Sequence, residues 1–128
     1  MRLINFWTIC LAGALLAGCA ATVKADRGRS GQVAATCIDQ AQCELYWKRA
    51  QDWVAQNSRR PMRSTTDWML MTESPGVFDS SPTFQVTRWP DPTGSGEIRF
   101  EAYCSTFLPC SPGPAHALEE FSRFITAP

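Results

Sequence analysis

Residues 97–104 have the sequence Glu-Ile-Arg-Phe-Glu-Ala-Tyr-Cys, in which polar and apolar side chains alternate. Because successive side chains of a β-strand point to opposite faces, this pattern predicts a strand with one face in a hydrophobic core. The expected core-facing residues are Ile98, Phe100, Ala102 and Cys104. The residues expected on the exposed face are Glu97, Arg99, Glu101 and Tyr103. The segment therefore predicts a sheet that is covered on one face.

Two further strands are expected before this one. Residues 90–96, Pro-Asp-Pro-Thr-Gly-Ser-Gly, are rich in turn formers and predict a reversal after a weakly alternating strand at 83–89. Residues 65–72 are rich in Thr, Trp, Met and Leu, which favours another strand. The turn-rich segment 73–82 connects the two. The simplest arrangement is a three-stranded antiparallel sheet.

Helical periodicity is found on both sides of these strands. Residues 40–57 carry an apolar stripe at a 3.6-residue repeat, Asp39 and Gln42 fit a capping box at its start, and Pro61 ends it. A second amphipathic helix follows Gly113. We therefore expect an α+β domain of order α-β-β-β-α, with two helices on one face of the sheet.

The composition is that of a globular protein with no excess of charge. The chain has 128 residues, 45% of them hydrophobic, and 12 Lys+Arg balance 12 Asp+Glu. This balance argues against a nucleic-acid partner, which favours a basic domain. A cationic cluster at residues 59–63 follows the first helix. We expect it to complement the helix C-terminus, and an anionic partner is the alternative.

The first twenty residues have the three parts of a secretory signal peptide. Arg2 supplies a positive charge, residues 3–16 form a mostly apolar run, and small residues follow at 17–21. The apolar run is shorter than the ~20 residues that a transmembrane helix needs. We therefore expect a cleaved signal peptide at residues 1–18.

Residues 16–19, Leu-Ala-Gly-Cys, resemble a bacterial lipobox. The resemblance implies that Cys19 becomes the first mature residue and carries a diacylglyceryl thioether and an N-terminal acyl chain such as palmitate, which would anchor the protein to a membrane. Ala20 stands where an Asp would retain an enterobacterial lipoprotein in the inner membrane. This implies the periplasm-facing leaflet of the outer membrane. Ordinary cleavage near residues 23–25, releasing a soluble protein, is the alternative.

The segment after the lipobox differs in composition from the rest. Residues 20–36 contain Gly, Ser and three cations but no aromatic residue. Because such a segment buries little apolar surface, we expect residues 19–36 to be the lipidated cysteine and a flexible tether. The folded domain is then expected at residues 37–128, which is long enough for one modest core.

Four cysteines remain in that domain, which are Cys37, Cys43, Cys104 and Cys110. An even number in an exported chain predicts two disulfides. The capping box brings Cys37 near Cys43, which favours local pairs, Cys37–Cys43 and Cys104–Cys110; a Cys43–Cys104 bond is the alternative. Five residues separate each local pair, more than the usual spacing of zinc ligands, so we expect no metal site.

The domain broadly resembles small proteobacterial envelope lipoproteins. The shared elements are the paired cysteines at 37–43, Tyr-Trp at 46–47, Trp-Val at 53–54 and the C-terminal cysteine pair at 104–110. The resemblance extends over most of the mature chain. It implies an envelope location and brings no activity with it.

Groups suited to catalysis are few. His116 is the lone histidine, and the chain lacks a Gly-x-Ser-x-Gly elbow that would present a nucleophile beside it. Glu97 and Glu101 would lie about 13 Å apart on a strand, beyond the ~9.5 Å limit for a glycosidase pair. We therefore expect neither a catalytic site nor a cofactor.

The exposed face of the sheet is expected to carry the function. Arg99, Tyr103 and Trp89 are the candidate binding residues, because Trp, Tyr and Arg dominate the binding energy of protein interfaces. An envelope protein is the expected partner. The alternative is a ligand or peptidoglycan-binding module that uses exposed Trp89 and Tyr103.

The lipobox generates a direct prediction. Cys19→Ser removes the sulfur that would carry the lipid, so the variant should lose lipoprotein processing and membrane association. Cell fractionation and mass spectrometry of the mature N-terminus measure both. A native chain whose N-terminus is Asp26, without acyl mass, would contradict lipidation.

Overall fold

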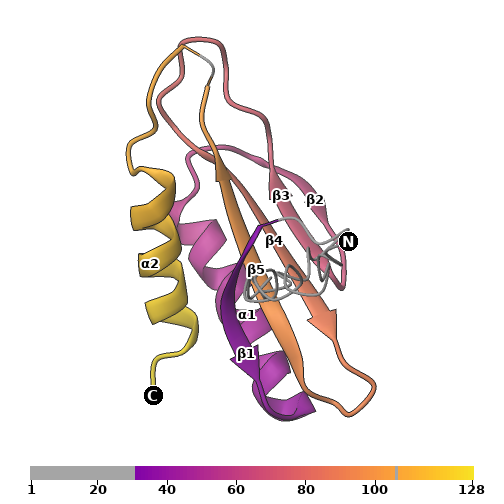
Figure 1. Ribbon diagram of the computed structural model, residues 1–128. Helices are drawn as coiled ribbons and strands as arrows, with labels where there is room; N and C mark the ends of the chain where they lie inside the picture. The colour runs from indigo at the N-terminus through magenta and orange to yellow at the C-terminus, as the bar shows by residue number, and fades with distance from the viewer. Residues whose placement is uncertain (1–30, 106) are drawn as a thin grey trace, which may run out of the picture.

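The computed structural model describes residues 31–105 and 107–128. The elements are β1 (Gln32–Cys37), α1 (Gln40–Asn57), β2 (Met62–Thr65), β3 (Met69–Thr72), β4 (Thr83–Pro90), β5 (Gly96–Tyr103) and α2 (Pro114–Ile125). The strands form one antiparallel sheet in the order β1-β5-β4-β3-β2. Both helices pack on the same face of this sheet (Figure 1). The expected α+β class is confirmed, but the sheet has five strands where three were expected.

One difference arises because the expected strand at 65–72 is a hairpin. The chain reverses between β2 and β3, and the Thr66 hydroxyl accepts the backbone N–H of Met69 at 2.9 Å. The backbone N–H of Thr66 in turn donates to the carbonyl of Met69 at 2.9 Å. A Thr side chain that bonds to the backbone a few residues on competes with a continuous strand. The β-forming composition of the segment concealed this turn.

The second difference is β1, which lies in the segment expected as tether. Residues 32–36 are part of this strand, which pairs antiparallel with β5 from Gln32 opposite Phe100 to Cys37 opposite Gly96. Ala35 and Cys37 are buried in the core. The short side chains of β1 gave a weak strand signal. The strand forms because it pairs with β5, and that pairing could not be read from the local sequence. The folded domain therefore begins before residue 37.

The expected alternation of β5 is present, and it builds the core. Ile98 and Phe100 are buried, and the Phe100 ring stacks on Phe121 of α2 with ring centroids 4.6 Å apart. Trp53 of α1 contacts Phe84, Phe100 and Phe121 at centroid distances of 5.1, 5.7 and 5.3 Å. These tilted and edge contacts are favourable aromatic geometries. One aromatic cluster therefore joins the sheet to both helices.

The start of α1 follows the expected cap. The Asp39 carboxylate accepts the backbone N–H of Gln42 at 2.8 Å, and the Gln42 side chain accepts that of Ile38 at 2.9 Å. The local disulfides Cys37–Cys43 and Cys104–Cys110 are both present, with Cα atoms 5.1 and 5.2 Å apart. The alternative bond between Cys43 and Cys104 is therefore excluded.

The aromatic cluster predicts a large effect of Phe100→Ala. Removal of this ring leaves a cavity against Trp53 and should lower the free energy of unfolding by about 3–5 kcal/mol. Phe124→Ala is the matched control, since its ring is 38% exposed on α2, and it should cost about 1 kcal/mol or less. Urea unfolding followed by tryptophan fluorescence measures both. Equal losses would contradict the central role of the cluster.

Candidate interaction surfaces

Arg99, expected to be exposed, is buried with 8% of its surface accessible. Its Nε donates to Glu97 at 3.0 Å, and its Nη1 donates to the carbonyl of Gly31 at 3.1 Å. Because β5 lies between β1 and β4, Arg99 is in the interior of the sheet, beside Thr87 and Val33. The expectation of an exposed binding arginine is therefore wrong. Arg99 connects the start of β1 to β5.

Trp89 and Tyr103 are too far apart to form one cleft. Trp89 lies opposite Glu97, and Tyr103 lies six residues further along β5, about 20 Å away at the rise of a strand. The indole of Trp89 is partly buried and donates to the Thr87 hydroxyl at 3.0 Å. Tyr103 is 39% exposed, and burial, followed by the carboxylate of Glu101, raises its pKa to about 12. Its phenol therefore stays neutral at physiological pH.

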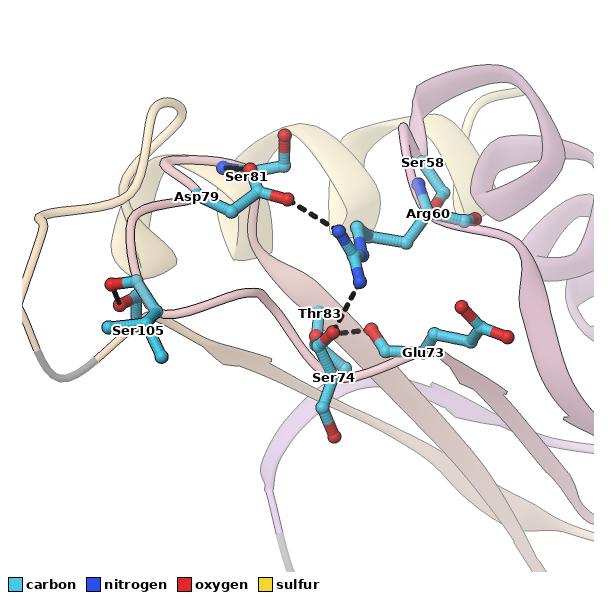
Figure 2. Close-up of polar contacts among 9 residues, drawn as sticks. Ser58, Arg60, Glu73, Ser74, Asp79, Ser81, Thr83 and Ser105 are labelled. Carbon is cyan, nitrogen blue, oxygen red and sulfur yellow. Dashed lines mark hydrogen bonds and ion pairs between the residues drawn. The ribbon is translucent and has the colours of Figure 1, made fainter.

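Arg60, from the cationic cluster, holds a loop and does not cap a helix. The helix α1 ends at Asn57, and the Arg60 guanidinium pairs with Asp79 and donates to the carbonyl of Ser74 at 2.6 Å (Figure 2). Asp79 also accepts the backbone N–H of Ser81 at 2.8 Å. Bonds from Ser81, followed by Arg60, lower the pKa of Asp79. This clamp fixes the loop between β3 and β4.

The loop between β3 and β4 meets the loop between β5 and α2 at one end of the molecule (Figure 1). The Ser105 hydroxyl donates to the carbonyl of Val77 at 2.5 Å, and the rings of Phe78 and Phe107 are 6.1 Å apart. Val77, Phe78 and Phe107 are 58, 80 and 68% exposed. We name these three residues the apolar tip. The apolar tip was not predicted from the sequence, although large apolar residues among turn formers were a visible signal.

A second surface surrounds Arg88 of β4. Its guanidinium donates to both carboxylate oxygens of Glu44, at 2.7 and 3.3 Å, and lies 5.5 Å from the centre of the Trp47 ring. The bond to Arg88 and its charge lower the pKa of Glu44. An open hollow of about 460 Å³, which we name the Arg88 groove, lies here. Its lining residues are Glu44, Trp47, Lys48, Gln51, Asp67 and Arg88.

Two features extend this groove. A smaller hollow of about 150 Å³ shares Glu44 and Arg88 with it and is also lined by Trp89. Trp68, which is 51% exposed, accepts the backbone N–H of Arg88 through its carbonyl at 2.9 Å. Of the expected binding residues, Trp89 alone borders the smaller hollow, and its indole bonds to Thr87, which does not line the groove. The groove combines the Trp47 ring with charges of both signs.

His116 lies at the surface of α2, where its imidazole is 63% exposed and 3.2 Å from Glu120. Residues 31–105 and 107–128 contain no group of three side chains suited to hold a metal ion. Within that same part of the chain, neither helix is long and apolar enough to cross a membrane. Cys19 and the expected signal peptide lie outside the described residues. Comparison with family models, curated proteins and solved structures found no match.

The contacts of Arg99 predict a loss of stability in Arg99→Ala. The change leaves the Gly31 carbonyl and the Glu97 carboxylate without this donor, and should lower the free energy of unfolding by about 1–3 kcal/mol. Arg63→Ala is the matched control because Arg63 is exposed, and it should change stability by about 0.5 kcal/mol or less. Chemical denaturation of both variants measures the difference. Unchanged stability of Arg99→Ala would show that these bonds contribute little.

Proposed function

We propose that the chain is a bacterial lipoprotein, anchored in the outer membrane through Cys19 and facing the periplasm. We propose further that its domain is a non-catalytic protein-interaction module. The lipobox at residues 16–19 supports the anchor. The disulfides Cys37–Cys43 and Cys104–Cys110 suit an oxidising compartment such as the periplasm.

The Arg88 groove is the proposed binding surface, and the observation that carries the proposal is the fixed position of Arg88. Its guanidinium is held by Glu44 and lies over the Trp47 ring, with Trp68 exposed nearby. Trp and Arg are the residues that contribute most at protein interfaces. Because Arg88 is already ordered, a partner that binds it has less conformational entropy to remove.

The shape and charge of the groove favour a protein segment over a small ligand. The smaller hollow of about 150 Å³ is below the ~300–1,000 Å³ of typical ligand pockets. The larger groove is open and carries the carboxylates of Glu44 and Asp67 beside the cations of Lys48 and Arg88. A partner with both signs of charge would complement this surface, and its association should weaken with salt. The separation of Trp89 from Tyr103 argues against the peptidoglycan-binding alternative.

In-cell crosslinking tests this proposal. Lys48→p-benzoylphenylalanine places a photoreactive group at an exposed groove position, because the Lys48 side chain is 73% exposed. We expect one discrete adduct with an envelope protein. Adding Arg88→Ala to that chain should lower the adduct yield about tenfold or more, in keeping with a hot-spot residue.

The control position is Glu119 of α2, whose side chain is 66% exposed and does not line the groove. Glu119→p-benzoylphenylalanine should give no such adduct. Arg88→Ala should change stability by about 1 kcal/mol or less, because Glu44 is half exposed. Adducts that form equally at both positions, or that persist after Arg88→Ala, would contradict the groove as binding surface.

A further inference from the structure

The apolar tip is a part of the molecule that the proposed function does not use. Residues 74–78, Ser-Pro-Gly-Val-Phe, and 104–112, Cys-Ser-Thr-Phe-Leu-Pro-Cys-Ser-Pro, contain no charged side chain. Charged residues make up 19% of the whole chain, so their absence from these two segments, which carry Val77, Phe78 and Phe107, is a local feature. An exposed apolar patch of this kind marks a surface for a protein or a membrane.

The tip is held in place by several bonds. The Arg60–Asp79 ion pair fixes one loop, and the Cys104–Cys110 disulfide closes the other. The backbone N–H of Ser111 donates to the carbonyl of Ser80 at 2.9 Å and joins the two loops. Because the tip is already ordered, its burial by a binding surface would require little further ordering. These bonds hold the exposed rings of Phe78 and Phe107 in a fixed position at the surface.

The chemistry of the tip favours a lipid surface over a protein. Val77, Phe78 and Phe107 include none of the Trp, Tyr or Arg residues that concentrate binding energy at protein interfaces. A stable protein interface buries about 800 Å² on each partner, more than three side chains at a loop end provide. The interface of a bilayer can take up a small uncharged loop end, because the lipid molecules rearrange to surround its side chains.

The path of the chain allows the tip to reach the bilayer that would carry the anchor. Gln32 pairs with Phe100, in the half of β5 that leads to the loop with Phe107. The twelve residues 19–30 precede the described chain and span at most about 40 Å when extended. The domain would therefore stay within reach of the membrane surface.

We propose that the apolar tip inserts into the interface of the phospholipid bilayer in which the chain is anchored, so that the anchor and the tip together orient the domain. This proposal rests on the membrane anchoring proposed above. Arg88 lies five residues beyond Thr83, where β4 leaves the tip loop, about 17 Å along the strand. Insertion of the tip therefore leaves the Arg88 groove accessible from the periplasm.

Depth-dependent fluorescence quenching tests the contact. The full chain is reconstituted in vesicles of phosphatidylethanolamine and phosphatidylglycerol, with and without bromine on the acyl chains. Phe78→Trp and Phe107→Trp place reporters on the tip, and the signal of the processed parent chain, which keeps four tryptophans after residues 1–18 are removed, is subtracted. We expect brominated lipid to reduce the added fluorescence about twofold or more at both positions, as for residues in the interface.

Phe124→Trp is the matched control, since Phe124 is 38% exposed in the last turn of α2, at the end of the molecule away from the tip (Figure 1). Its added fluorescence should be unchanged by bromine.

Vesicle flotation separates the two proposals. A chain that floats with the vesicles while bromine quenches neither tip reporter would overturn the tip contact but not the membrane anchor. A chain that does not float would contradict both proposals. Acrylamide in the aqueous phase quenches reporters that are exposed to water. If a bound protein protects the tip reporters from acrylamide and vesicles do not, the tip binds a protein and the lipid contact is overturned.

Discussion

Trp53 lies where α1, α2 and the sheet meet, and its indole contacts Phe84 of β4, Phe100 of β5 and Phe121 of α2. These aromatic side chains bury the largest areas in a small core, so their contacts set how the two helices and the sheet approach one another. The proposed binding surfaces lie around this core, one at an end of the sheet and the other beside α1.

The two proposed surfaces differ in chemistry and lie along the same strand. At the start of β4, the clamp of Arg60 on Asp79 holds the loop that carries Val77 and Phe78 of the exposed apolar tip. Towards its end, Arg88 pairs with Glu44 and lies over Trp47 in a groove with charges of both signs. An apolar end suits a lipid interface, and a charged aromatic groove suits a folded partner. The strand thus separates the proposed membrane contact from the proposed protein contact.

Three arginines illustrate how bonding partners decide the role of a charge. Arg60 and Arg99 bond to backbone carbonyls of Ser74 and Gly31 as well as to a carboxylate, and both act within the fold. Arg88 bonds to the half-exposed Glu44 and also lines the groove. A guanidinium has five donors in a rigid fork, so one side chain can connect two segments that are distant in sequence. Composition alone could not separate these roles.

The sequence by itself determined the α+β class, both helices, the core-facing side of β5 and the pairing of neighbouring cysteines, because each depends on residues close together in the chain. It did not predict β1 or the hairpin of β2 and β3, nor did it predict the apolar tip or the burial of Arg99. The strand β1 exists because it pairs with β5, about sixty or more positions away, and that pairing also encloses Arg99. The tip forms where two loops meet, far apart in sequence. Contacts between distant segments are selected by the packing of the whole chain, and therefore only the tertiary structure decided them.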